Sequence, residues 1–392
     1  MQKYVQYIFA LFTVACIAAC GGSGTTTTPT FVYDHPTTLA PSNTHMGGAV
    51  QGGTISTKVS NYSVSTFTGI AGSAGFSNYS TINGPPATFN HPTGITTDGT
   101  TFYVADYGTN FIRKVTSSGT VTTLQCTTDG TTSIGFNRPT SLTIKADGSQ
   151  LYVVDSGSNT IRIIDIATNK VTTVGATDGS GGSVDSTDKT AARFNQPTGI
   201  TTDGDNLYVT DSGNQTIRRI DLKNNYAVST LAGTSGSVGS SDGIQSAARF
   251  NLPARITTDR TSLYVTDFNN RTIRKIDILT GTVTTIAGTS GPLSSDDGTA
   301  DGTGTAAHFN QPNGITTDGT NLYVTDSYTN TIRKVVISTG EVTTLSGIAG
   351  ITGHVDTADG TPPSFDTPVG ITTDGTSFFV ADSYNNTIRK IQ

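Results

Sequence analysis

Hydrophobic and polar positions alternate in short runs along most of the chain, and one stretch shows the pattern clearly. Residues 312–318 (PNGITTD) predict a strand that ends at an Asp-Gly turn signal, and residues 322–326 (LYVTD) predict a second strand. After a polar turn, residues 331–335 (TIRKV) predict a third strand, and residues 342–345 (VTTL) predict a fourth. Alternation with a period of two, interrupted by turn residues, is typical of consecutive antiparallel strands.

The same unit occurs six times. Each copy contains a phenylalanine, usually followed by asparagine, at Phe89, Phe136, Phe194, Phe250, Phe309 and Phe365. Each copy also contains an aspartate seven residues before an arginine, and these pairs are Asp106/Arg113, Asp155/Arg162, Asp211/Arg218, Asp267/Arg274, Asp326/Arg333 and Asp382/Arg389. Successive aspartates of the pairs lie 49, 56, 56, 59 and 56 residues apart. Six repeats of four strands predict an all-β, six-bladed β-propeller of four-stranded blades.

The two ends of the chain complement each other. The last copy stops at Gln392 after its third strand, and residues 64–72 (VSTFTGIAG) match fourth strands such as residues 228–233 (VSTLAG). We therefore expect one propeller over residues 60–392, closed by an N-terminal strand that completes the last blade. A closed ring leaves no sheet edge open to another chain.

The N-terminal segment reads as an export signal. Lys3 precedes an apolar run that is shorter than the ~20 residues of a membrane-spanning helix. The run ends at residues 17–20 (IAAC), which resemble a bacterial lipobox and imply that Cys20 is lipidated after residues 1–19 are removed. The alternative is an ordinary cleaved secretion signal. No aspartate follows Cys20, and by resemblance to lipoprotein sorting signals this implies the outer membrane of the cell envelope.

Residues 20–59 are rich in Gly, Ser, Thr and Pro and predict a flexible tether behind the lipid anchor. The propeller is then left with one cysteine, Cys126, so no disulfide within it is expected. Cys126 follows a predicted strand and is expected to be a small packed residue.

The repeat units at residues 197–220 and 312–335 resemble NHL repeats, whose pattern runs proline, Gly-Ile, Asp-Gly, Tyr-Val, Asp-Ser, Asn and a basic-hydrophobic strand. The resemblance extends over all six units and implies a β-propeller, here of a bacterial lipoprotein type. NHL propellers include enzymes, protein binders and RNA binders, so the resemblance implies no single activity.

Composition and charge narrow the function classes. The chain has 45 glycines and few helix-forming residues, which excludes a helical bundle and disfavours a doubly wound α/β fold. The formal net charge is −6, whereas a nucleic-acid-binding surface is usually basic. We therefore expect no nucleic-acid partner.

Residues that recur in every unit are expected to serve the blade. The Asp-Arg pairs, for example Asp211 and Arg218, flank a turn and should meet across it, and the basic residues of the third strands are expected on a solvated rim. Aspartates in the connectors suggest calcium ligands, which are carboxylate and carbonyl oxygens; these aspartates are Asp185, Asp188, Asp296, Asp297, Asp301, Asp356 and Asp359. The alternative, based on a column of Asp188, Asp242, Asp301 and Asp359, is an N-cap of a short helical turn.

Positions that differ between units are the better candidates for a binding site. The residue before the repeated proline is His91, Arg138, Gln196, Leu252, Gln311 or Thr367, and two residues beyond that proline Arg255 and Ser141 replace glycine. These positions begin the innermost strands, so His91, Arg138, Gln196, Arg255 and Gln311 are expected to form a polar ring at one mouth of the central channel. The alternative is variation without function at exposed loop positions.

The turn between the second and third strands also varies. Tyr107, Phe268, Tyr328 and Tyr384 replace smaller residues there, beside Asn269, Asn270, Asn385 and Asn386. Exposed aromatic rings beside amides suit contact with a peptide or a glycan. The alternative is that these rings pack onto neighbouring loops.

Catalysis is the competing hypothesis. Some propellers of similar sequence are lyases that use metal-bound histidines at the channel, and His91, His308 and His354 are the histidines of the predicted propeller. Glu341 is expected on the opposite face, and no nucleophile motif is present. The sequence thus favours a monomeric, lipid-anchored envelope module that binds or scaffolds a protein, peptide or glycan, without a cofactor. The alternative is a metal-dependent lyase or hydrolase that holds zinc or calcium at the channel mouth.

Overall fold

A computed structural model describes residues 62–78, 87–128, 130–291, 298–357 and 361–392, all within a compact unit that spans Val59–Gln392. The predicted signal peptide, Cys20 and the predicted tether lie outside the described residues. No helix in the described part is long and apolar enough to cross a membrane.

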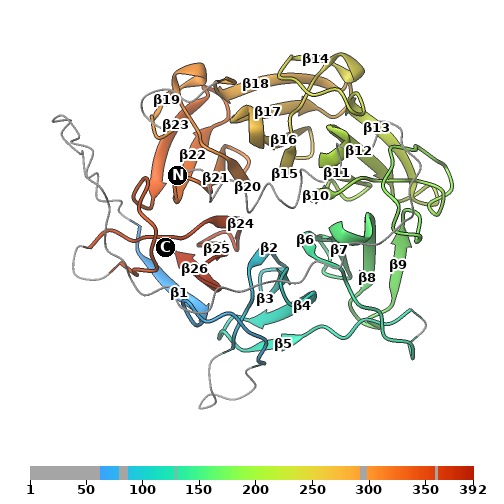
Figure 1. Cartoon of the computed structure of the whole chain (residues 1–392), viewed down its shortest axis with the longest axis horizontal. Helices are drawn as coiled ribbons and strands as arrows, with labels where there is room; N and C mark the ends of the chain where they lie inside the picture. Colours follow the sequence, from blue (N-terminus) through green and yellow to red (C-terminus); the bar gives the residue numbers. More distant parts are fainter. Residues whose placement is uncertain (1–61, 79–86, 129, 292–297, 358–360) are drawn as a thin grey trace, which may run out of the picture. The chain divides into compact units, whose positions relative to one another are not determined.

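Six antiparallel sheets are arranged as the blades of a β-propeller (Figure 1). Blades one to three consist of β2 (Pro92–Thr97), β3 (Thr101–Asp106), β4 (Phe111–Thr116) and β5 (Val121–Thr123); β6 (Pro139–Ile144), β7 (Gln150–Asp155), β8 (Thr160–Asp165) and β9 (Val171–Val174); and β10 (Pro197–Thr202), β11 (Asn206–Asp211), β12 (Thr216–Asp221) and β13 (Ala227–Gly233). Blades four and five consist of β15 (Pro253–Thr258), β16 (Ser262–Asp267), β17 (Thr272–Asp277) and β18 (Thr282–Gly288); and β20 (Pro312–Thr317), β21 (Asn321–Asp326), β22 (Thr331–Val336) and β23 (Glu341–Ser346). The first strand of each blade lies innermost.

The predicted closure is confirmed. Blade six contains β24 (Pro368–Thr373), β25 (Phe378–Asp382) and β26 (Thr387–Ile391), and its outermost strand is β1 (Val64–Gly69). Strands β1 and β26 are antiparallel, with Val64 opposite Ile391 (Figure 1). The last blade is therefore assembled from both ends of the described chain.

Connectors between blades add short strands outside the predicted four. Strand β14 (Gly243–Ile244) pairs with β18, and β19 (Gly302–Thr303) pairs with β23, so blades four and five have five strands. Each of these strands is followed by a short 3-10 helix, at Gln245–Ala247 and Gly304–Ala306.

The hydrophobic core is divided among the six seams between neighbouring blades. At one seam, Val154 and Ile163 of blade two pack with Phe194 and Val209 of blade three. At the closing seam, Phe379 of blade six packs with blade-one residues. β-branched and aromatic side chains suit these pleated, closely packed faces, which explains the Val, Ile and Tyr content of the strands.

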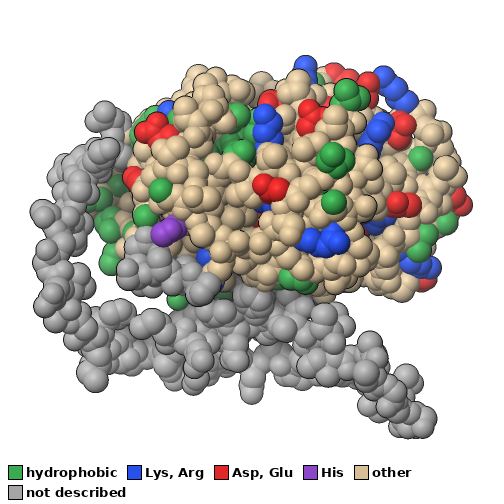
Figure 2. Space-filling model, turned by 90° about the horizontal axis from the view of Figure 1, so that it is seen from above, with side chains coloured by type: hydrophobic (Ala, Val, Ile, Leu, Met, Phe, Trp, Pro, Cys, Tyr) green, Lys and Arg blue, Asp and Glu red, His purple; other side chains and the backbone are tan. Residues whose placement is uncertain are grey.

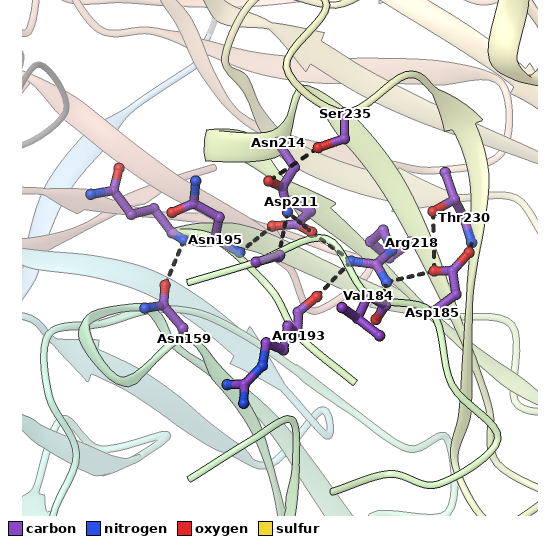
Figure 3. A network of polar contacts seen from close by, with 12 residues as sticks. Asn159, Val184, Asp185, Arg193, Asn195, Asp211, Asn214, Arg218, Thr230 and Ser235 are labelled. Atoms are coloured by element: carbon purple, nitrogen blue, oxygen red, sulfur yellow. Dashed lines mark hydrogen bonds and ion pairs between the residues drawn. The ribbon is translucent and has the colours of Figure 1, made fainter. Parts of the chain in front are cut away.

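The repeated aspartate and arginine form an ion pair in each blade, and in five blades both side chains are buried. In blade three the Nη1 group of Arg218 donates to Asp211 (2.7 Å) and to the carbonyl oxygen of Arg193 (2.9 Å) (Figure 3). Its Nη2 group donates to the carbonyl oxygen of Val184 (3.0 Å) and to Asp185 (2.6 Å). We call this arrangement the arginine clamp; it joins the second strand, the third strand and the connector of one blade.

The clamp corrects two expectations about charged residues. The arginine side chains of five pairs are 0–1% exposed, so they do not lie on a solvated rim. The connector aspartates that bind them are Asp185, Asp242, Asp301 and Asp356. Aligning Asp188 and Asp359 with Asp242 and Asp301 was therefore wrong. Asp359 itself lies outside the described residues.

The N-cap interpretation is also wrong for the connectors of blades four and five. The residues at the N-caps of the two 3-10 helices are Ile244 and Thr303, and neither side chain makes a capping hydrogen bond. The carboxylate of Asp242 instead accepts from Arg274 and from Thr285 of β18. Asp296 and Asp297, which were considered as calcium ligands, lie outside the described residues.

Blade two departs from the clamp. Arg162 bonds Asp155 through Nε (2.9 Å) and Thr173 through Nη1 (2.7 Å), and its side chain is 12% exposed. The connector that precedes this blade belongs to the shortest repeat, and no connector carboxylate among the described residues is paired with Arg162.

Candidate functional site

The predicted ring lies at one end of the propeller, which we call the loop face. It comprises the six residues that precede the innermost strands, His91, Arg138, Gln196, Leu252, Gln311 and Thr367, together with the six turns between second and third strands. All six residues have left-handed backbone conformations, with φ between 47° and 67°. This conformation is uncommon for residues other than glycine, and here it turns each connector into the innermost strand.

The backbone of these positions links neighbouring blades. The N–H group of His91 donates to Asn386 Oδ1 of blade six (2.9 Å), and that of Gln196 donates to Asn159 Oδ1 of blade two (2.7 Å). The N–H group of Leu252 makes the same contact with Gln215 Oε1 (2.6 Å). Since these contacts between blades are made by backbone N–H groups, the side chains at these positions can differ from blade to blade without disturbing the ring.

Side chains of the predicted ring are accessible to different degrees. Arg138 is exposed, while His91, Gln196 and Gln311 are half-buried. Tyr328 and Tyr384 are 39% and 40% exposed. These side chains present cationic, amide and phenolic groups on the loop face.

The structure brings two of the predicted residues into contact across a seam. The ring of His91 in blade one meets that of Tyr384 in blade six edge to face, with centroids 5.1 Å apart. The Nδ1 atom of His91 also lies 2.6 Å from Asn90 Oδ1. These contacts hold the imidazole in one orientation on the loop face.

The four turn aromatics occupy two different positions. Tyr328 and Tyr384 are second in their turns and reach solvent, whereas Phe268 is first and only 5% exposed. The first position holds serine in other blades, and Ser327 there donates to the carbonyl oxygen of Pro368 in the next blade (2.6 Å). Phe268 therefore packs inside the ring, as the structural alternative anticipated, and Tyr107 at the same position is half-buried.

The neighbouring asparagines are also structural. Asn270 donates to Asp267 (2.7 Å) and to the carbonyl oxygen of Gly239 (2.7 Å). Asn385 makes the equivalent bond to Asp382 (2.8 Å). These amides stabilise the buried carboxylates of the arginine clamps and are unavailable to a ligand.

Arg255 lies within the central channel. Its side chain is 9% exposed and donates to the carbonyl oxygens of Thr198 (2.9 Å) and Thr140 (3.0 Å), which belong to blades three and two. Glycines fill the same position in four blades because a Cβ there would crowd the adjacent strand; at Gly94 it would lie 2.8 Å from the Cα atom of Ser141. Arg255 is thus separated from the exposed members of the predicted ring.

The histidines do not form a shared site in the described structure. The carbonyl oxygen of His308 accepts from Arg333 (3.0 Å), the role that Arg193 has in blade three. Across the described residues, no three His, Cys, Asp or Glu side chains are placed to hold a metal ion. Glu341 is exposed at the start of β23, at the end of the blade opposite the loop face.

Sequence reasoning missed the groups that hold Arg255. They are the carbonyl oxygens of Thr140 and Thr198, and a backbone acceptor leaves no mark in the sequence. The signal that the sequence did contain was an arginine at a repeat position where four of the six blades have glycine.

Comparisons with known proteins agree with this architecture. The model of the NHL repeat family matches residues 194–220, which run through the first three strands of blade three. NHL repeat-containing protein 2 of Homo sapiens is 30% identical over 167 residues, 39% of this chain and 22% of that protein. The corresponding protein of Gallus gallus is 38% identical over 85 residues, 22% of this chain and 11% of that protein. The matches thus span about a fifth or less of these relatives.

Several solved structures share the fold. A protein of unknown function from Bacteroides thetaiotaomicron has a TM-score of 0.64 and 21% identity, covering 84% of this chain and 76% of its own. An auxiliary nutrient binding protein from the same organism has a TM-score of 0.61 and 17% identity, covering 85% and 76%. Virginiamycin B lyase from Staphylococcus aureus has a TM-score of 0.50 and 18% identity, covering 77% and 95%. The chain is therefore a six-bladed β-propeller in which the NHL repeat family model matches one unit.

Proposed function

We propose that this propeller is a binding or scaffolding module that holds its ligand on the loop face. The observation that carries the proposal is the contrast between backbone and side chains in the ring. Six residues share one left-handed conformation, yet their side chains are imidazole, guanidinium, amide, alkyl and hydroxyl groups. Loops that converge on a rigid scaffold are where propellers and other repeat folds carry specificity.

The chemistry of the loop face suits a ligand with both polar and apolar surfaces. Arg138 and Gln196 offer hydrogen-bond donors, and Tyr384 offers a half-exposed ring held by His91. A protein, peptide or glycan has the matching groups. Basic and acidic side chains are interspersed over the side of the propeller drawn in Figure 2, which does not favour a polyanion. A propeller neighbour named as a nutrient binding protein is compatible with this use of the fold.

A matched pair of triple variants tests the proposal. The first replaces His91, Arg138 and Tyr384 on the loop face with alanine. The second replaces Lys223, Leu279 and Glu341, exposed residues in or beside hairpin turns at the opposite end, with alanine. Arg138 and the three opposite-end residues are exposed, so each of these substitutions should change stability by less than about 0.5 kcal/mol. Loss of the ring contact between His91 and Tyr384 should cost about 0.5–1.5 kcal/mol.

Binding would be measured on glycan and peptide arrays and by pull-down from an envelope extract. The loop-face variant should lose at least about tenfold in affinity, since aromatic and arginine contacts dominate most interfaces. The opposite-end variant should bind as the wild type does. Equal binding by the loop-face variant and loss in the opposite-end variant would place the ligand elsewhere.

We further propose that Cys20 anchors the module to the envelope, with the outer membrane as its site. The support is the sequence of residues 17–20 and the Gly/Ser/Thr/Pro-rich segment after it. Two or more acyl chains anchor firmly because each buried CH₂ contributes ~0.8 kcal/mol. Cys20→Ser should move the protein from the detergent phase to the aqueous phase or block its processing. Unchanged partitioning would contradict lipidation.

A further inference from the structure

The propeller axis contains a cavity of about 90 Å³ that is lined by the innermost strands. Arg255 lies on its wall beside Ser141 and Gly314, and Thr96 and Thr201 also line it. All six blades contribute to this wall, so the cavity lies on the axis of the ring.

Arg255 is a buried cation without a carboxylate. Its two Nη groups bond only carbonyl oxygens, and its Nε atom is buried with no hydrogen-bond partner. No ion pair involves Arg255 among the described residues. Burial lowers the pKa of its guanidinium to about 10, with no neighbouring charge to oppose the shift, so the group is still charged at neutral pH.

The contrast with the other buried arginines is sharp. Five other arginines, Arg113, Arg218, Arg274, Arg333 and Arg389, are also buried, and each faces a buried aspartate within 3.5 Å. A buried charge is costly unless an opposite charge compensates it. The carbonyl dipoles of Thr140 and Thr198 compensate Arg255 only in part.

We infer that the axial cavity binds one small monovalent anion, a chloride ion or a simple carboxylate, against Arg255. At about 90 Å³ the cavity is small, whereas sites for sugars or drug-sized ligands usually exceed about 300 Å³. Thr96 and Thr201 line the same wall, and a threonine hydroxyl is a donor that suits an anion. This site is inside the ring and does not depend on a ligand at the loop face.

Anion-specific stabilisation of the full-length protein tests the inference. Thermal unfolding would be followed in sodium chloride, sodium acetate and sodium gluconate at equal ionic strength, because gluconate is a much larger carboxylate than acetate. Above the dissociation constant, the anion that binds should raise Tm by about 2 °C for each tenfold increase in concentration. The chloride and acetate series show which of the two anions the site prefers.

Two variants locate the effect. Arg255→Gly restores the residue that most blades hold and should abolish the difference from gluconate. Arg138→Gly removes an exposed arginine from a position whose positive φ suits glycine, and it should retain the difference. Loss of the difference in Arg138→Gly but not in Arg255→Gly would overturn the inference.

Bromide-soaked crystals of the wild type provide a second measurement that needs no variant to fold. Anomalous density within hydrogen-bonding distance of the Arg255 guanidinium is expected. A channel without such density, together with equal Tm values in the three sodium salts, would show that no anion binds there.

Discussion

Removing the arginine of one clamp should destabilise the propeller far more than removing its connector aspartate. Arg218→Met leaves the carboxylate of Asp211, which is fully buried, without its counter-charge. It also removes the donors to two carbonyl oxygens and a cation–π contact with Phe194, where the guanidinium lies 5.1 Å from the ring centroid. Breaking a buried pair at one partner typically costs about 3–5 kcal/mol. Asp185→Ala removes a 46% exposed partner and should cost about 1 kcal/mol.

Because the buried Asp211 carboxylate has lost its ion-pair partner, the stability of Arg218→Met should depend on pH. Burial already raises the pKa of Asp211 to about 6, although Arg218 lowers it. Without Arg218 the folded-state pKa rises further above the unfolded value, so the folded variant binds a proton that the unfolded chain does not. Its stability is therefore greatest at low pH and is lost as the pH rises through the folded pKa, by up to about 1.4 kcal/mol per pH unit.

Urea unfolding of wild type, Arg218→Met, Asp185→Ala and the double variant Arg218→Met/Asp211→Asn, each at pH 5.5 and 8, measures these effects. The deficit of Arg218→Met should be larger at pH 8. The double variant should recover about 1–2 kcal/mol at pH 8, because the amide introduced by Asp211→Asn is neutral and leaves no unpaired charge buried. A deficit below 1 kcal/mol, or one that does not change with pH, would refute the claim that Arg218 neutralises a buried charge.

Three other expectations follow from the fold. Deleting residues 1–58 should leave a cooperatively unfolding protein, whereas deleting residues 1–72 removes β1 and should cause aggregation or non-cooperative melting; equal melting curves would contradict the closure. Burial raises the pKa of the Cys126 thiol to about 12, so at pH 8 its thiolate fraction should be about a thousandfold smaller than that of an exposed cysteine, and a thiol reagent should not label it in the folded protein. If the folded Cys126→Ser variant showed fewer reactive thiols than the folded wild type, this expectation would be wrong. Gly370→Ala should cost about 1–3 kcal/mol because its Cβ would meet the backbone of Thr93, while Gly135→Ala has open space and should be neutral in urea titrations.

The fold was predictable because the six units are redundant. Each strand boundary could be checked against five other copies, and residues 64–72 matched the fourth strand that blade six lacked. The connectors were harder, since their lengths differ and the alignment of Asp188 with Asp242 was off by three residues. The correct partner, Asp185, is defined by its contact with Arg218, which lies 33 positions later in the chain.

The candidate site was predictable in outline only. Comparing columns singled out His91 and Tyr384 without indicating that their rings meet across a seam. It grouped Phe268 with Tyr328, although one position in the turn separates a buried ring from a half-exposed one. Arg255 was recognisable as an arginine at a position where most blades have glycine. The orientation of its side chain in the channel depends on backbone carbonyl oxygens of two other blades.

Pairing of β1 with β26 also imposes an order on biosynthesis. Val64 leaves the ribosome 327 residues before its partner Ile391, so at ~5–20 residues per second it waits roughly 15–65 s. During that time the nascent chain can form its middle blades but not blade six. The ring can therefore close only after translation of the last strand, and a chaperone or an export channel has this interval in which to act on an open, incompletely folded chain.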